Sequence, residues 1–287
     1  MALRQRSDSN KKVGEKRKES QDCIARFSAN SSQSKQATSR KKILEKLTIE
    51  EIKPSSRKYP YVGFEQEKEV GNDLLHITDL SKSIDGQVMF SNLNITIQKG
   101  DKVAFVGPND LAKTVLFQIL MGELPSDKGE IKWGYSTSRA YFPKDNTKYF
   151  DSDLSIVDWL RQYTTNKDEN FVRGFLGRML FSGEESLKPV RVLSGGEKVR
   201  CILARMMLVQ GNVLIFDEPT NHLDLESITA LNRGLEKFKG TILFSSHDHE
   251  LLQTVTNRII AITPDGYIDR VGTTYDEYLA DTKIKVH

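Results

Sequence analysis

Residues 102–121 read KVAFVGPNDLAKTVLFQILM, which predicts an apolar strand, a loop and then a helix over 113–121. This is the arrangement of a phosphate-binding loop, where the pattern GxxxxGK[ST] surrounds phosphates with backbone N–H groups. Its Lys reaches the β and γ oxygens and its hydroxyl holds Mg²⁺. Eight consecutive residues are therefore candidates for nucleotide binding: Gly107, Pro108, Asn109, Asp110, Leu111, Ala112, Lys113 and Thr114.

Two residues of this loop depart from a related pattern, GxxGxGK[ST]. Asp110 and Ala112 stand where that pattern has glycine, at positions that favour positive φ or a close approach of phosphate. A left-handed backbone costs a non-glycine residue about 1–2 kcal/mol. A carboxylate about 4 Å from a phosphate charge adds up to about 4 kcal/mol at an effective dielectric of 20. Screening by Lys113 and Mg²⁺ makes this an upper estimate, so we expect weakened phosphate binding.

A second motif, NVLIFDEPTNHLD at 212–224, places two acids directly after an apolar strand. We expect Asp217 to hold Mg²⁺, through water or together with Thr114, and Glu218 to orient and polarise the water that attacks a γ-phosphate. The alternative, a pair of helix-capping acids, is disfavoured because the phosphate-binding loop precedes these acids and a further motif lies between.

That intervening motif is LSGGE, which comprises Leu193, Ser194, Gly195, Gly196 and Glu197. A Ser hydroxyl and glycine amides at the start of a helix predict a second anion-binding site, favoured by the helix dipole.

A histidine follows another apolar strand in TILFSSHDHE, 241–250. His247 would lie just beyond the strand end, where a polarisable side chain can sense a γ-phosphate, although a lone His is more often a packed or surface residue. We expect a structural role for His222, in the turn after Glu218, and assign none to His249.

Short apolar segments alternate with longer amphipathic ones from about residue 73 onward. This favours an α/β fold with a largely parallel sheet covered by helices and with sites at the strand C-termini. We expect strands at 74–78, 88–97, 102–106, 130–134, 138–142, 212–216, 241–246 and 258–262, and helices at 113–121, about 155–180, 197–209 and 226–238.

The net charge of +3 conceals a strong asymmetry along the 287 residues. Residues 1–60 hold 16 Lys and Arg against 7 Asp and Glu, while residues 61–287 hold 26 against 32. The basic part has the composition of an exposed helical or disordered extension that contacts phosphates, or of a solvated linker.

No apolar run is long enough for a membrane span or a secretory signal, so we expect a cytoplasmic location and no membrane partner. Cys23 and Cys201 fit neither a disulfide framework nor a zinc site, and we interpret both as structural thiols.

Together these motifs resemble an ATP-binding cassette (ABC), over residues 74–280, and the NHLD that follows DEPT resembles the ABC-F class. Residues 23–47 and 54–69 are similar to the end of the interdomain linker and the entry into the second cassette, within a YbiT-like subgroup. The resemblance thus implies the C-terminal half of a two-cassette protein. It divides the chain into a basic helical linker arm, 1–72, and a P-loop ATPase cassette, 73–287, with a helical subdomain at about 150–195.

The resemblance also implies the partners and cofactors. Members of the class use ATP and Mg²⁺, and each site pairs the phosphate-binding loop and acids of one cassette with the LSGGE of another, so a second cassette is needed, in a homodimer or from a separate first-half protein. Better understood members bind the ribosome, which predicts contact of the basic arm with ribosomal RNA or transfer RNA. The chain departs from the family where Ile84 replaces the adenine-stacking aromatic residue and Lys144 replaces a metal- and water-coordinating Gln.

Four functions remain open from the sequence. The first is an ABC-F-like protein that binds ATP and hydrolyses it weakly. The second is a non-catalytic half that donates its LSGGE to another cassette. The third is a transporter nucleotide-binding subunit, disfavoured by NHLD and the linker, and the fourth is a truncated remnant.

Overall fold

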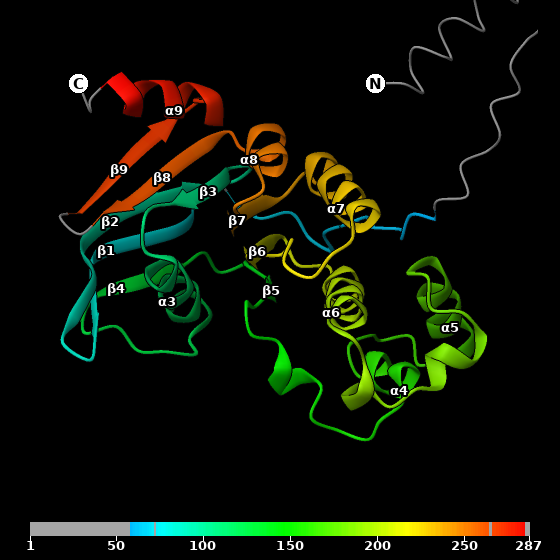
Figure 1. Ribbon diagram of the computed structural model, residues 1–287. Helices are drawn as coiled ribbons and strands as arrows, with labels where there is room; N and C mark the ends of the chain where they lie inside the picture. Colours follow the sequence, from blue (N-terminus) through cyan, green and yellow to red (C-terminus); the bar gives the residue numbers. More distant parts are fainter. Residues whose placement is uncertain (1–57, 72, 264–265, 285–287) are drawn as a thin grey trace, which may run out of the picture. The chain divides into compact units, whose positions relative to one another are not determined.

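The computed structural model describes residues 58–71, 73–263 and 266–284, which form one unit beginning at Lys58 (Figure 1). In chain order its elements are β1 (Asp73–Ile84), β2 (Gln87–Gln98), β3 (Lys102–Val106), α3 (Asp110–Met121), β4 (Lys128–Trp133), β5 (Arg139–Phe142), η2 (Thr147–Tyr149), α4 (Ile156–Arg161), α5 (Glu169–Arg178), η3 (Gly183–Leu187), η4 (Val190–Val192), α6 (Gly195–Val209), β6 (Val213–Asp217), α7 (Leu225–Lys237), β7 (Thr241–Ser245), α8 (His249–Val255), β8 (Arg258–Thr263), β9 (Gly266–Val271) and α9 (Tyr275–Ile284).

The described strands form two sheets. A six-stranded sheet has the order β5-β6-β7-β3-β8-β9, in which every neighbouring pair is parallel except β8 with the edge strand β9. A three-stranded antiparallel sheet has the order β2-β1-β4. The predicted α/β cassette fold is confirmed, with a separate antiparallel sheet beside the largely parallel one.

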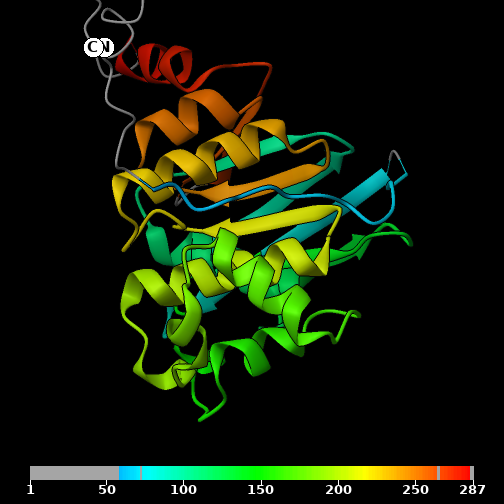
Figure 2. The same cartoon turned by 90° about the vertical axis from the view of Figure 1, so that its right-hand side faces the viewer.

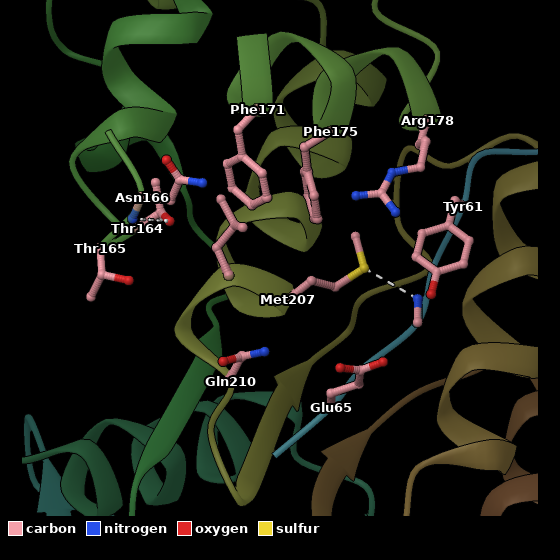
Figure 3. A pocket seen from close by; sticks show the side chains of 12 residues that line it. Tyr61, Glu65, Thr164, Thr165, Asn166, Phe171, Phe175, Arg178, Met207 and Gln210 are labelled. Atoms are coloured by element: carbon pink, nitrogen blue, oxygen red, sulfur yellow. Dashed lines mark hydrogen bonds between the residues drawn. The ribbon is translucent and has the colours of Figure 1, made fainter. Parts of the chain in front are cut away.

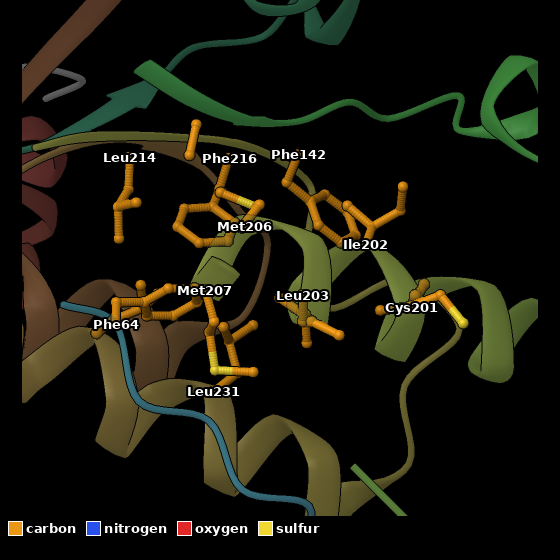
Figure 4. Packing of buried hydrophobic residues seen from close by; sticks show 14 of the residues in the cluster. Phe64, Phe142, Cys201, Ile202, Leu203, Met206, Met207, Leu214, Phe216 and Leu231 are labelled. Carbon is orange, nitrogen blue, oxygen red and sulfur yellow. The ribbon is translucent and has the colours of Figure 1, made fainter. Parts of the chain in front are cut away.

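The side chains of the buried strand β6 alternate between two cores, as the period of two in a strand requires. Leu214 and Phe216 join the core that contains α6, α7 and α8, while Val213 and Ile215 join the core that contains α3 and the three-stranded sheet. Figure 4 shows the first core, where residues of α6 meet Phe216 and Leu231. Both faces of the six-stranded sheet are therefore covered, and the ends of its strands are the places left for a site.

The helical stretch expected at 155–180 is divided into two helices. Ser155 accepts a hydrogen bond from the Asp158 amide at the start of α4, and Asp168 caps α5 through the Asn170 amide. The residues between them, 162–168, interrupt the helix. Helices α4 and α5 pack together and α4 packs on α6, and these helices lie beside the six-stranded sheet (Figure 2).

The segment 58–71 packs onto the cassette. Phe64 is buried with its ring edge-on to those of Phe216 and Phe238, at centroid distances of 5.7 and 6.4 Å. The Tyr61 amide donates to the Arg178 carbonyl. The greater part of the predicted basic arm, residues 1–57, and Cys23 with it, lies outside the described residues, so the arm and its boundary at 72 remain predictions.

Several described elements have no counterpart among the expected ones: α8, β9, α9 and the short 3-10 helices η2, η3 and η4. A cap signal precedes α8, since the Asp248 carboxylate accepts from the Leu251 amide at 2.8 Å.

Cys201 is buried and reduced, and its burial raises the pKa of its thiol. Among the described residues, no helix is both long and apolar enough to span a membrane.

Candidate functional site

Three neighbouring strands bring the predicted site residues to one edge of the six-stranded sheet. β7 lies between β3 and β6 and runs parallel to both, so the C-terminal ends of all three meet. The loop 107–114 follows β3, Asp217 ends β6 and Glu218 comes directly after it, and His247 follows β7. The structure therefore brings together the loop, both acids and the histidine that the sequence predicts as a site.

The loop 107–114 enters its helix earlier than expected. Gly107 has φ 144°, and a Cβ at this position would clash with the carbonyl oxygen of Ile262. α3 begins at Asp110, and Asn109 caps it by accepting from the Ala112 amide at 3.3 Å. Neither Asp110 nor Ala112 has a positive φ. The expected left-handed strain at these positions is wrong, because both residues belong to the first turn of the helix.

The side chain of Asp110 turns back into the loop. Its Oδ1 lies 2.7 Å from Lys113 Nζ, and its Oδ2 lies 3.1 Å from His247 Nε2. Hydrogen bonding to the Lys113 ammonium is the main cause that lowers the pKa of Asp110 to about 2, and His247 acts in the same direction. Lys113 is buried. Lys113 and His247 thus both contact the carboxylate of Asp110, a negative charge that belongs to the chain itself.

Asp217 and Thr114 suit a divalent cation. Ser245 Oγ donates to Asp217 Oδ1 at 2.9 Å, whereas Asp217 Oδ2 and Thr114 Oγ1 are buried without a hydrogen-bond partner in the described part of the chain. Burial raises the pKa of Asp217, and the nearby Thr114, Ser245 and Lys144 side chains oppose that shift. An orphan carboxylate oxygen beside an orphan hydroxyl is a hard-oxygen donor set of the kind that Mg²⁺ prefers.

Glu218 is buried and strained. Its φ is 51°, and the residue is 3% exposed. Neither carboxylate oxygen has a hydrogen-bond partner among the described residues. Its Oε1 lies 3.5 Å from His247 Nε2. Burial raises the pKa of Glu218, while the positive charges of His247 and Lys113 lower it. Strain and an unsatisfied buried carboxylate together are typical of a functional position.

The LSGGE segment is capped at the start of α6. Ser194 Oγ donates to Glu197 Oε2 at 2.7 Å, and the Glu197 amide donates back to Ser194 Oγ at 3.4 Å. A Cβ on Gly195 or Gly196 would lie 3.4 or 3.2 Å from atoms of His222. The two glycines allow the turn that contains His222 to pack closely, which agrees with a structural position for that histidine. Leu193 is buried at the base of the segment.

Lys144 and Thr114 line a cavity of about 220 Å³ together with Tyr141, Gln118 and other residues. Its lining carries charges of both signs, since Lys144 and Lys148 lie there together with Glu123 and Asp145. Ile84 is half-buried at the end of β1 and is not among the residues that line this cavity.

A second group of side chains could also hold a cation. Asp110, Glu218 and His247 each offer a ligand atom, and these atoms lie within 4.8 Å of one another. A cation there would meet the Lys113 ammonium, which already occupies one oxygen of Asp110. Thr114 and Asp217 are therefore the better-suited pair.

The residue that sequence reasoning missed is Ser245, whose hydroxyl fixes one oxygen of Asp217. Its signal is position, because it ends β7 directly beside Asp217 in the register. A further cavity, of about 360 Å³, lies between segment 58–65, α5 and the end of α6 (Figure 3). None of its lining residues was predicted to bind nucleotide or metal.

Comparisons with known proteins agree with this geometry. A family model described as ABC transporter matches residues 90–221, and an extension model with the same description matches residues 1–64. The chain is similar to "Uncharacterized ABC transporter ATP-binding protein YkpA" of Bacillus subtilis (58% identity; 99% of this chain, 53% of that protein). It is also similar to "Probable ATP-binding protein YbiT" of Escherichia coli O157:H7 (42%; 93% and 50%) and to "ABC transporter F family member 5" of Arabidopsis thaliana (30%; 90% and 37%). The chain thus spans about half the length, or less, of these relatives.

Solved structures show the same fold. The ATP-binding cassette MJ0796, a dimer in a post-hydrolysis state bound to ADP and Pi, matches with a TM-score of 0.59 at 15% identity, over 70% of this chain and 100% of that chain. cbiO1 of Clostridium perfringens, part of the ABC transporter complex cbiONQ, matches with a TM-score of 0.54 at 20% identity, over 75% and 93%.

Proposed function

Because the chain belongs to the ABC-F class of ATP-binding cassette proteins, we propose that it binds an adenine nucleotide with Mg²⁺ at the loop 107–114 and hydrolyses ATP slowly. One observation carries this proposal: Lys113, Asp217, Glu218 and His247 meet at one edge of the sheet, and two of the carboxylate groups there are buried without full partners. Buried unsatisfied acids beside a phosphate-type loop need a ligand to balance them.

The roles follow from the positions. Thr114 and Asp217 would hold Mg²⁺, which when bound neutralises phosphate charge. Glu218 orients the attacking water and accepts its proton, a role suited to a carboxylate with a raised pKa. Lys113 and His247 hold phosphate oxygens.

The test is calorimetric titration of the full 287-residue chain with Mg-ATP, using Glu218→Gln to prevent turnover. We expect saturable binding with a Kd at or below the millimolar range, and parallel titration of Lys113→Ala should abolish it. If neither the wild type nor Glu218→Gln binds below millimolar concentration, and the Asp110→Gly/Ala112→Gly variant does not either, the proposal is wrong.

We further propose that the site is completed by a second cassette, either another copy of this chain or a separate first-half protein. The matched MJ0796 structure is a dimer, which supports a paired arrangement. Three apolar side chains are exposed near these motifs: Leu111 in the loop 107–114, Val192 just before the LSGGE and Leu225 just after the NHLD turn. Sedimentation of the protein with and without Mg-ATP would measure the pairing.

A second candidate function is supported by the capped LSGGE. In this function the chain donates Ser194 and its glycines to a nucleotide on a partner cassette and turns over little ATP itself. Its support is the contrast between the complete capping box at α6 and the loop 107–114, which holds its own Asp110 carboxylate.

For the cellular role we propose association with the ribosome through the basic residues 1–60, and hence a cytoplasmic location. Binding dominated by phosphate contacts must weaken steeply between roughly 50 and 200 mM salt. Co-sedimentation with ribosomes over that range tests this role, and salt-independent or absent co-sedimentation would contradict it. The transporter description of the family models supports the remaining alternative, a nucleotide-binding subunit, for which reconstitution with a membrane partner is the test.

A further inference from the structure

The carboxylate of Asp110 is held from two sides by groups that come from distant parts of the chain. Lys113 Nζ lies 2.7 Å from Oδ1, and His247 Nε2 lies 3.1 Å from Oδ2. The lysine is one helical turn away, while the histidine arrives from the end of β7. Two donors that converge on one carboxylate bind it as they would bind a separate anion.

These two donors are the ones that a terminal phosphate would use. In a phosphate-binding loop the lysine reaches the β and γ oxygens. Glu218, the predicted water-orienting acid, contacts the same histidine, with Oε1 3.5 Å from the same Nε2 atom. A water-orienting acid must lie next to the γ-phosphate. The Asp110 carboxylate is therefore at the γ-phosphate end of the site.

Thr114, the last residue of the loop 107–114, is not held in this way. Thr114 Oγ1 has no hydrogen-bond partner among the described residues, and it borders the cavity of about 220 Å³ that Lys144 also lines. The N-terminal turn of α3, a helix of 12 residues, directs its dipole toward the loop. The Thr114 hydroxyl therefore remains available to a ligand, whereas Lys113 and His247 are occupied by Asp110.

We infer that Asp110 takes the place of a terminal phosphate, so that this site binds a nucleoside diphosphate in preference to a triphosphate. The inference rests on the proposed function, since it concerns the same site. A γ-phosphate must either enter beside an ionised carboxylate or displace it from Lys113 and His247. With its pKa lowered to about 2, Asp110 stays ionised at neutral pH, so protonation does not relieve the repulsion.

The preference also accounts for the retained acids. Asp217 Oδ2 is buried without a hydrogen-bond partner among the described residues, and Mg²⁺ bound with a diphosphate would satisfy it without requiring a phosphate beside Glu218. Such a site would hold the product nucleotide while Asp110 stays bonded to Lys113 and His247.

The test is calorimetric titration of the full chain with ADP and, separately, with ATP, at constant Mg²⁺, for the wild type, Asp110→Asn and Asp127→Asn. The last is a matched control, because Asp127 forms a lysine pair of the same 2.7 Å length, with Lys82, and bonds the Ser83 amide, in the three-stranded sheet. Circular dichroism verifies that each variant is folded.

We expect the wild type to bind ADP about tenfold or more tightly than ATP. Asp110→Asn should raise the affinity for ATP by about tenfold and change that for ADP by less than about threefold, and Asp127→Asn should change neither. Equal or tighter binding of ATP by the wild type would overturn this inference and leave the proposed function intact. An unchanged preference in folded Asp110→Asn would also overturn it. Failure of both nucleotides to bind the wild type and Asp110→Asn would overturn the proposed function and this inference together.

Discussion

The loop 107–114 and the LSGGE segment 193–197 both place polar groups at the start of a long helix, but they use them differently. In the LSGGE segment Ser194 and Glu197 bond each other, and Ser194 and Gly195 are exposed. In the loop, the Asp110 side chain bonds Lys113 and His247, which are the groups that should face a ligand. The bonds between Ser194 and Glu197 cap the start of α6, whereas the bonds of Asp110 occupy Lys113 and His247, which are donors that a phosphate would need. The surface offered to a partner is therefore more intact than the cradle for the chain's own nucleotide.

The largest expected effect comes from a substitution in the LSGGE segment. Ser194→Arg should abolish the ATPase activity that this chain supports in a partner cassette with an intact GxxGxGK[ST] loop, because a long charged side chain blocks the open surface. The measurement is phosphate release from the mixture. Ser182→Arg is the matched control, since Ser182 forms the same kind of capping box with Glu185 outside the predicted site. Partner activity that survives Ser194→Arg would exclude the donor function.

The next effect concerns the acid beside the loop. Glu218→Gln should lower any ATP hydrolysis by about 10² to 10⁴-fold, the usual contribution of a positioned general base. Single-turnover phosphate release measures it. Glu184→Gln, an exposed acid in the helical region, makes the same chemical change away from the sheet edge and should leave the rate unaltered. A Glu218→Gln rate close to the wild-type rate would remove Glu218 from the chemistry.

A third prediction separates the two departures in the loop. Asp110→Gly should raise the affinity for ATP by about 10 to 100-fold, because it frees Lys113 and His247. Ala112→Gly alone should leave that affinity close to wild type, since Ala112 is helical and unstrained. It should instead cost about 0.5–1 kcal/mol of stability, as glycine does inside a helix. Calorimetry and thermal unfolding measure both, and a gain from Ala112→Gly alone would contradict the electrostatic explanation.

Features of the site that depend on neighbouring residues could be predicted from the sequence, whereas contacts between distant positions of the chain could not. The order of strands and motifs was predictable, because Asp217 and His247 each follow a continuous apolar segment and parallel strands bring their ends together. The direction of the Asp110 side chain was not, because it depends on His247, 137 positions away. The strain expected at Asp110 and Ala112 was wrong because an earlier helix start was not foreseen. The edge strand β9 is only partly buried, so its apolar pattern is weak.

The smallest expected effect is on stability, and its sign follows from Glu218. Burial raises the pKa of Glu218 above its ordinary value of 4.5, so the ionised form destabilises the folded chain at neutral pH. Between that ordinary value and the raised one the native state binds more protons than the unfolded state, and stability therefore rises as the pH falls through the folded pKa. Glu218→Gln removes the buried charge. We expect its Tm to exceed that of the wild type by a few degrees at pH 7–8, given about 2–4 °C per kcal/mol in a chain of this size. The difference should vanish as the pH approaches 4, where Glu218 is protonated in both states. Glu184→Gln should show no such dependence, and a Glu218→Gln variant less stable than the wild type at pH 8 would mean that Lys113 and His247 outweigh burial at this site.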